Sequence, residues 1–236
     1  MTPLHSGGLS ATLIAVLVAT ACSRATTGAR GPSPTTASVP RATTAQRDLS
    51  YIAKARADSV NRPYTAADIH FMSGMISHHA QAILMASWAP THGASSSVRT
   101  LCERIINAQK DEIAIMQQWL RDRLQPVPEP SPTGMKMMMN GVEHEMLMPG
   151  MLTEAQMKQL DQARGPEFDR LFLTFMIQHH RGAVAMVKEL FGTYGAGQDE
   201  TVFKLASDVN VDQTTEIARM ERMLAALTLG ISAPSP

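Results

Sequence analysis

The chain has 236 residues, which is enough for one domain of moderate size or two small ones with a continuous apolar core. Its 21 Lys and Arg balance its 21 Asp and Glu, so no field of one sign favours binding to nucleic acid or to an anionic membrane surface. Aromatic residues make up 5% of the chain, whereas methionines number 17, more than a core needs for filling gaps. The composition therefore disfavours a nucleic-acid-binding function and leaves the methionine excess to be explained.

The N-terminus has the features of an export signal. Residues 9–21 are apolar or small, a length that suits a signal-peptide core and is too short to span a bilayer. The Val-Ala-Thr-Ala-Cys sequence that ends at Cys22 resembles a lipobox, in which the cysteine becomes the lipid-bearing first residue of the mature chain. We therefore expect residues 1–21 to be removed and the protein to be lipid-anchored, in the periplasm or on the outer face of a membrane. The alternative is an ordinary cleaved signal in which Cys22 is incidental.

A tether is expected between the lipid and the folded domain. Residues 22–47 are mostly Thr, Ser, Ala, Pro and Gly, a composition that cannot offset the entropy of ordering the chain. The helical domain is expected over residues 48–230, and a short amphipathic helix is expected over about 47–60. If Cys22 is acylated, Cys102 has no partner for a structural disulfide.

Four long helices are predicted from the 3.6-residue spacing of apolar residues. They are expected over residues 64–88, 97–124, 166–191 and 200–229. The first two form a hairpin over about 64–124 and the last two a hairpin over about 166–229. Thr65 and Asp68 provide a capping box for the first helix, and Pro166 opens the third.

The crossover between the hairpins, residues 125–165, is rich in methionine. It begins with a Pro-rich run, and residues 135–151 then hold seven methionines and His144. Because these methionines follow neither the helix nor the strand period, we expect an irregular loop there. A short helix follows, with Thr153 and Gln156 as its capping box.

The chain contains an internal repeat. Residues 68–79 align without a gap on residues 169–180. The shared motifs are Met-Ile-x-His-His at 75–79 and 176–180 and Gln-x-x-Glu-Ile at 109–113 and 213–217. Two duplicated helix hairpins joined by one long crossover predict an all-α four-helix bundle of ferritin-like type.

A helical wheel separates the histidines into two pairs. His79 and His180 point into the predicted bundle, whereas His78 and His179 lie on its flank, where solvent or the crossover can reach them. The predicted interior also holds a polar layer of Asp68, Gln109, Glu112, Asp169, Gln213 and Glu216. Buried carboxylates are costly unless they are paired, hydrogen-bonded or bound to metal. Each inward histidine therefore either bonds to a Glu or Gln across its hairpin, which fixes the helix register, or belongs to a metal site.

The sulfur atoms near these histidines favour a copper site. Met75 is one helical turn from His78 and His79, and Met176 is one helical turn from His179 and His180. Thioether with imidazole suits copper, with Met favouring Cu(I) and imidazole also accepting Cu(II). The further candidate ligands in the crossover are Met137, Met138, Met139, His144, Met146, Met148 and Met151. The alternatives for the crossover are a Met-rich flap over an apolar surface or a flexible peptide-binding face.

With these motifs in place, the chain resembles the bacterial family called domain of unknown function 305. The family combines two Met-Ile-x-His-His repeats and Gln-x-x-Glu-Ile helices with a Met-Pro-Gly-Met segment, here residues 148–151, and the resemblance covers about residues 48–228. It implies an exported protein of ferritin-like fold, in a family of which some periplasmic members bind copper. It does not imply an enzyme activity.

The sequence as a whole predicts a metal-binding lipoprotein that sequesters copper, with a metal ion and the membrane as its partners. It assigns no catalytic residue and no protein partner. One alternative is a structural or partner-binding lipoprotein without metal. A di-metal carboxylate oxidase is less favoured, because no predicted helix carries Glu-x-x-His and because Asp68 and His79 lie about 16 Å apart along their helix.

Overall fold

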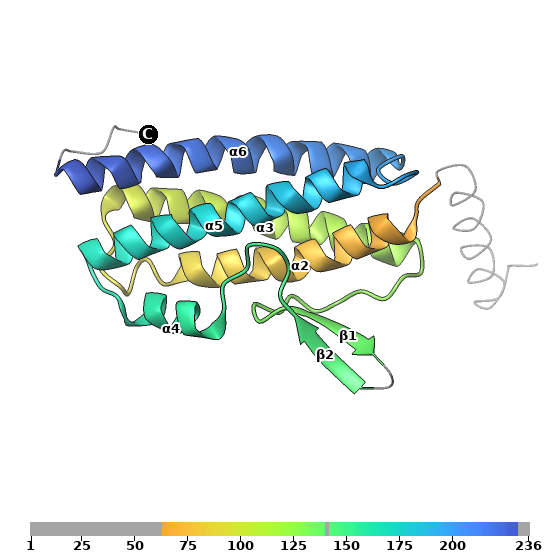
Figure 1. The fold of residues 1–236 in the computed structure, drawn as a ribbon, viewed down its shortest axis with the longest axis horizontal. Helices are drawn as coiled ribbons and strands as arrows, with labels where there is room; N and C mark the ends of the chain where they lie inside the picture. The colour runs from red at the N-terminus through yellow and green to blue at the C-terminus, as the bar shows by residue number, and fades with distance from the viewer. Residues whose placement is uncertain (1–62, 140–141, 231–236) are drawn as a thin grey trace, which may run out of the picture. The chain divides into compact units, whose positions relative to one another are not determined.

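A computed structural model describes residues 63–139 and 142–230 of the chain. Four long helices lie in this part, with a shorter helix between the second and the third (Figure 1). Their bounds are Ala66–Ser87 for α2, Ser96–Asp122 for α3, Glu154–Gln162 for α4, Pro166–Gly192 for α5 and Glu200–Leu229 for α6. The predicted signal segment, Cys22, the tether and the helix over 47–60 lie outside the described residues.

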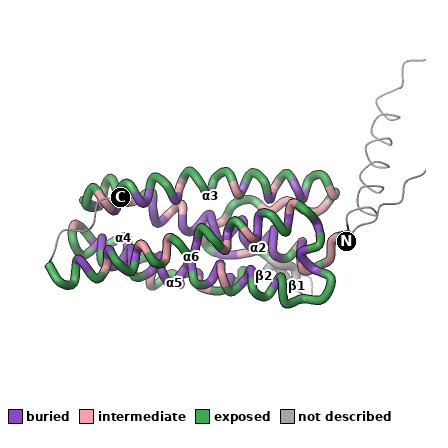
Figure 2. Tube along the Cα trace, turned by 90° about the horizontal axis from the view of Figure 1, so that it is seen from above, coloured by how far each residue is buried: buried purple, intermediate pink, exposed green. Residues whose placement is uncertain are grey.

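The helices form two hairpins that pack into one bundle. Helix α2 packs against α3, α5 packs against α6, and the hairpins meet where α2 packs against α5. Buried residues line the sides of the helices that face one another, and exposed residues cover the outside (Figure 2). The predicted all-α four-helix bundle of two hairpins is therefore confirmed, with the single long crossover that is typical of ferritin-like connectivity.

The helix starts follow the capping residues of the sequence. The Thr65 hydroxyl accepts from the backbone N–H of Asp68, whose carboxylate accepts from the Thr65 backbone in return. Thr153 and Gln156 form the same reciprocal pair at the start of α4, and Pro166 is the first residue of α5. Because such contacts satisfy the free N–H groups of a first helical turn, both predicted capping boxes are confirmed.

Asp68 and Asp169 connect the two hairpins. One carboxylate oxygen of Asp68 accepts from the backbone N–H of Gly197, before α6, at 2.7 Å. The Asp169 carboxylate accepts from the backbone N–H of Ser95, before α3, with both N···O distances at 3.2 Å. Both aspartates are buried, as predicted. Their assignment to an inner layer with the Gln and Glu side chains is wrong, however, because each lies at a helix start and holds the turn of the other hairpin.

The methionine-rich crossover forms a β-hairpin, which corrects the expected irregular loop. Strand β1, Met135–Met139, pairs antiparallel with β2, Val142–Met146, and Met137 lies opposite His144 in the register. The hairpin extends away from the helices (Figure 1). The sequence does alternate between apolar and charged or polar residues over β2, as Val-Glu-His-Glu-Met, and at the start of β1, but the consecutive methionines at 137–139 interrupt this strand pattern.

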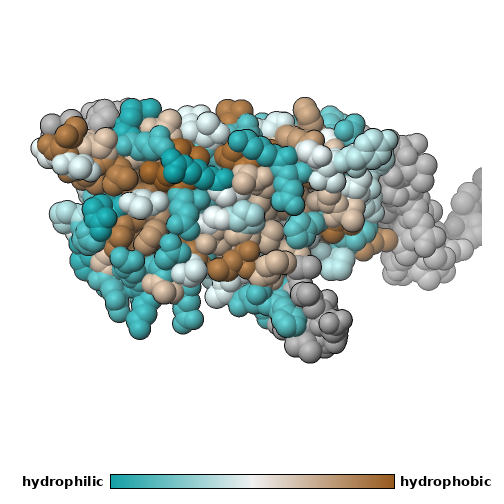
Figure 3. All heavy atoms as spheres, viewed as in Figure 1, coloured by the Kyte–Doolittle hydropathy of each residue, from teal (hydrophilic) through white to brown (hydrophobic). Residues whose placement is uncertain are grey.

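The surface combines polar and apolar residues. Hydrophilic side chains gather over α4, while apolar ones show between the long helices (Figure 3). None of the helices within residues 63–139 and 142–230 is long and apolar enough to cross a membrane.

Candidate metal site

His78 and His179, which occupy equivalent positions in the two repeats, meet where α2 packs against α5. Their ring centroids are 3.8 Å apart with the planes inclined by 39°, and both residues have no exposed surface. The prediction that they lie on a flank open to solvent is therefore wrong. Its physical reason is that every residue from 71 to 82 is buried, so this part of α2 has neighbours on all sides and no flank.

His79 and His180 are bonded across their own hairpins. His79 Nε2 lies 2.6 Å from a carboxylate oxygen of Glu112, and His180 Nε2 lies 2.7 Å from one of Glu216. The Glu side chains keep 13% and 22% of their surface exposed, so their charges stay in partial contact with water and cost less to place there. The predicted contact between each inward histidine and a Glu of the partner helix is confirmed.

The Met-Pro-Gly-Met segment, residues 148–151, lies over the histidine pair. His78 Nε2 is 3.0 Å from the carbonyl oxygen of Pro149. Gln81 holds the chain immediately after it, since the Gln81 amide accepts from the Leu152 N–H at 2.6 Å and donates to the Leu152 carbonyl at 3.0 Å. The expectation that the crossover reaches His78 is confirmed, although through a backbone carbonyl. Gln81 was missed by the sequence reasoning because its partners are far away in the chain.

Two glycines let this segment lie against the helices. A Cβ at Gly182 in α5 would come within 1.9 Å of the Pro149 carbonyl oxygen, and a Cβ at Gly74 in α2 would come within 2.7 Å of the Met148 methyl group. Because glycine has no Cβ, residues 148–151 can lie close against α2 and α5 at these two positions.

Burial keeps the two central histidines neutral. It lowers the pKa of His78 to about 3, with a further contribution from the neighbouring His79. The pKa of His179 is also well below its usual value, first because of burial and then because of the nearby His78. A neutral imidazole carries one N–H and one lone pair. Because a carbonyl only accepts, His78 donates to Pro149 from Nε2 and presents its lone pair at Nδ1.

Buried polar atoms without a hydrogen-bond partner are concentrated in the two repeats. Among the described residues, all such side-chain atoms except Nε of Arg123 belong to the four histidines or to two glutamines at equivalent positions. They are Nδ1 of His78, His79 and His180, both ring nitrogens of His179, the amide atoms of Gln109 and the amide oxygen of Gln213. Buried polar groups normally have a partner, so an ion or a water molecule is the expected explanation.

The predicted methionine ligands fall into two groups. Met75 and Met176 are fully buried in the helices that carry the histidines, and Met148 and Met151 are 6% and 5% exposed. In contrast, Met146 is 42% exposed, and His144 is also exposed on β2. The side chains of residues 137–139 lie outside the described ones.

Clusters of His, Cys, Asp and Glu were also considered as metal ligands within the described part of the chain. Nowhere in residues 63–139 and 142–230 do three His, Cys, Asp or Glu side chains lie close enough together to hold a metal ion. Cys102 is buried in the apolar core and is not part of a disulfide.

The fold and the paired histidines together define a class of duplicated helix-hairpin proteins. The sequence profile of the family described as a domain of unknown function (DUF305) matches residues 68–224. The chain belongs to this family, which confirms the resemblance seen in the motifs. No curated protein matches the chain at a significant level.

Solved structures of similar proteins have the same fold. A DUF305 protein from Streptomyces coelicolor is 29% identical with a TM-score of 0.57, and the match covers 72% of this chain and 96% of that one. A DUF305 fragment from Deinococcus radiodurans is 29% identical with a TM-score of 0.57, covering 69% and 98%. CopM in its Cu(I)-bound form is 28% identical with a TM-score of 0.50, covering 66% and 94%, and its Cu(II)-bound form is also similar.

Proposed function

We propose that this protein binds copper ions through the imidazoles of its two Met-Ile-x-His-His motifs, and sequesters them. The observation that carries the proposal is the concentration of unpartnered buried nitrogen atoms at equivalent positions of the two repeats. His179 is the extreme case, because neither ring nitrogen of this fully buried side chain makes a well-formed hydrogen bond, although the backbone of His78 lies near the ring. Leaving such a group unpartnered costs about 1 to 3 kcal/mol, which a bound ion would recover.

The protonation state of the central pair supports metal binding. Copper binds the lone pair of a neutral imidazole and competes with a proton for it. Because burial holds the pKa values of His78 and His179 far below neutrality, no proton has to be displaced at pH 7. The lone pair of His78 is directed to Nδ1 by the Pro149 carbonyl on the opposite side of the ring.

The nearby sulfur atoms favour copper among the metals. Met75 and Met176 lie one helical turn from the histidine pairs and are fully buried. Thioethers are soft ligands that select Cu(I), and imidazole accepts Cu(I) and Cu(II). The similar protein CopM has been crystallised with Cu(I) and with Cu(II), which supports copper as the metal for this chain.

The observed carboxylates favour copper over a di-metal carboxylate centre. Glu112 and Glu216 each bond to a single histidine, while Asp68 and Asp169 hold turns at helix starts. None of these four carboxylates belongs to a carboxylate cluster of the kind that holds two iron ions in ferritin-like proteins.

Copper titration of purified, metal-free protein tests the proposal. We expect Cu(I) competition with a chromophoric chelator to show weakened binding in His179→Phe and His78→Phe, which keep an aromatic ring in place without a lone pair. The matched control is His92→Phe: His92 is also buried, at 5% exposure, but bonds to Asp161 elsewhere. Met75→Leu and Met176→Leu preserve volume and remove only the thioether, so they test sulfur ligation separately from packing. If both His78→Phe and His179→Phe bind copper as wild type does, the motifs serve the packing of the bundle and not copper binding.

We also propose that the protein works outside the cytoplasm on a lipid anchor at Cys22. The support is the apolar stretch of residues 9–21 and the similarity to the Streptomyces coelicolor protein, which is described as a candidate secreted protein. Intact-mass measurement of membrane-extracted protein should show a chain that starts at Cys22 and carries added acyl mass. A chain that retains residues 1–21 would contradict this.

A further inference from the structure

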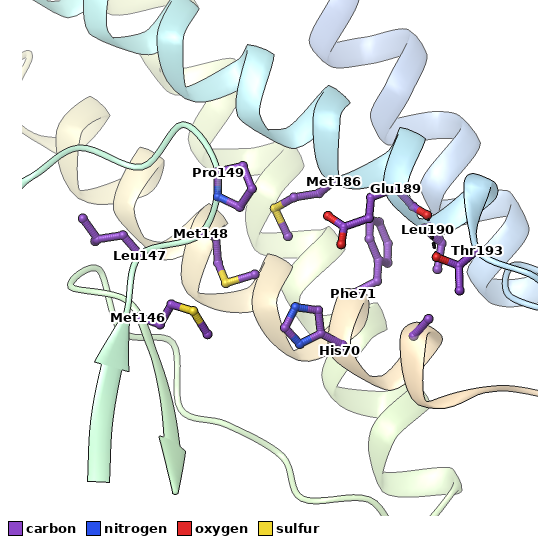
Figure 4. A pocket seen from close by; sticks show the side chains of 11 residues that line it. His70, Phe71, Met146, Leu147, Met148, Pro149, Met186, Glu189, Leu190 and Thr193 are labelled. Carbon is purple, nitrogen blue, oxygen red and sulfur yellow. Dashed lines mark hydrogen bonds between the residues drawn. The ribbon is translucent and has the colours of Figure 1, made fainter. Parts of the chain in front are cut away.

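A second group of soft donors lines a pocket away from the His78–His179 pair. The pocket has a volume of about 380 Å³ and lies between α2, α5 and the crossover. Figure 4 shows the thioethers of Met146, Met148 and Met186 and the imidazole of His70 around it. The crossover supplies two of these side chains, α5 supplies Met186, and α2 supplies His70.

Two of the methionines converge on one point. If Gly74 carried a Cβ, the sulfur of Met148 would lie 3.3 Å from it and the methyl group of Met186 would lie 3.6 Å from it. The end of the Met148 side chain and the Met186 methyl group therefore meet over the bare backbone of Gly74, although they come from the crossover and from α5. A larger residue at position 74 would displace Met148.

The pocket has one buried wall and one wall open to solvent. Met148 and Met186 are 6% and 5% exposed, so their sulfurs are shielded from bulk water. Met146 is 42% exposed, and His70 is also exposed. An ion can therefore approach from solvent past His70 and Met146 and exchange its water for the buried thioethers, without opening the bundle.

We propose that this pocket is a separate, solvent-accessible binding site for a soft monovalent cation of the Cu(I) or Ag(I) type, with His70, Met146, Met148 and Met186 as its donors. Thioethers with one imidazole suit such ions and bind hard divalent cations poorly. The carboxylate of Glu189 also lines the pocket and adds a negative charge that attracts cations to it. The inference rests on the proposed function only for the type of metal, since the His78–His179 pair contributes nothing to this pocket.

Ag(I) titration monitored by NMR of protein labelled with ¹³C at the methionine methyl groups tests the pocket, because Ag(I) is diamagnetic and does not change oxidation state. We expect the methyl signals of Met146, Met148 and Met186 to shift together as the ion binds. Met186→Leu should remove a bound Ag(I) equivalent and abolish the shifts of the other two. His70→Gln should weaken Ag(I) binding to the pocket. Because His70 is exposed, this substitution should leave the fold intact.

Matched controls separate this site from packing and from the central histidines. Met223→Leu replaces a methionine of the same 5% exposure on α6, outside the pocket, and should bind Ag(I) as wild type does. His179→Phe should leave the pocket shifts unchanged. If both Met186→Leu and His70→Gln show the wild-type Ag(I) stoichiometry and the wild-type methyl shifts, the pocket is not a binding site for the ion. If these two variants lose the ion while His78→Phe and His179→Phe bind copper normally, the pocket stands and the proposed central site fails.

Discussion

Gly182 of α5 lies directly against the carbonyl oxygen of Pro149, so closely that a Cβ at residue 182 would come within 1.9 Å of that oxygen and 2.6 Å of the Gly150 Cα. The same oxygen is the hydrogen-bond partner of His78. A single glycine on one repeat thus determines where the crossover meets the central histidine of the other repeat.

Gly182→Ala should therefore push the crossover off α5. The clash involves backbone atoms, which cannot move aside as a flexible side chain can, so we expect a loss of about 1 to 3 kcal/mol in the free energy of unfolding. Urea denaturation measures it. The control on the same helix is Gly192→Ala, where an added Cβ meets no atom within 4 Å, and unchanged or slightly raised stability is expected. Equal stability of the two variants would contradict the packing described here.

The histidine–glutamate bonds should contribute to stability equally in the two repeats. His79→Ala and His180→Ala each leave a half-buried carboxylate without its partner, which costs about 1 to 3 kcal/mol. Thermal or urea unfolding measures this, with His144→Ala, at an exposed position on β2, as the control. If the inward variants unfold like the control, the bonds do not hold the hairpins together.

The metal-free protein should lose stability as the pH falls from about 6.5 towards 3. In that range the unfolded chain protonates His78 and His179, whereas the folded protein does not, because burial and the adjacent His79 and His180 lower their pKa values. The unfolded state then binds more protons, so the free energy of unfolding rises with pH by about 1.4 kcal/mol per pH unit for each histidine. This stability is fully present above pH 6.5.

Variants of the central pair check the sign and the source of this pH dependence. Unfolding free energies measured by urea denaturation between pH 4 and 7 should have a shallower slope in His78→Phe and in His179→Phe than in wild type. A wild-type slope in both variants would mean that other groups, such as the carboxyls, cause the pH dependence.

The methionine-rich hairpin should be removable without loss of the bundle. Replacing residues 136–145 by a short Gly-Ser linker should keep the helical circular dichroism and the melting temperature, because the hairpin projects from the helices (Figure 1). Met148 has to be kept, since it is buried in the core. If the hairpin captures Cu(I), as its methionines suggest, the Cu(I) stoichiometry should fall, and an unchanged stoichiometry would exclude this role.

Local signals in the sequence were sufficient to predict where the helices begin. The capping boxes at Thr65 and Thr153 and the proline at 166 mark helix starts that the structure confirms. The bond of each inward histidine to its Glu was also predictable, because both residues lie on facing stripes of one hairpin. Periodicity is sufficient for such pairs, because it identifies the stripes of the two helices that face each other within a hairpin.

The stack of His78 on His179 was not predictable in this way. A helical wheel gives the direction of a side chain from its own axis but not which helix lies there, and the α2–α5 contact joins segments about a hundred residues apart. The β-hairpin had a usable signal, since Asn-Gly at residues 140–141 is a strong turn sequence between two strands. The run of methionines at 137–139 obscures the alternation of apolar and charged or polar residues that the two strands otherwise have.

The contacts of Asp68 with the turn before α6, and of Asp169 with the turn before α3, are reciprocal. Reciprocity of this kind, in which residue i of one half meets j of the other and j meets i, is the pattern of an isologous dimer. The chain is thus built like a symmetric homodimer of one helix hairpin whose subunits have become covalently joined. The two central imidazoles lie where the two-fold axis of that dimer would pass, so a hairpin with a single histidine at this position would acquire a two-histidine centre simply by pairing with its own copy.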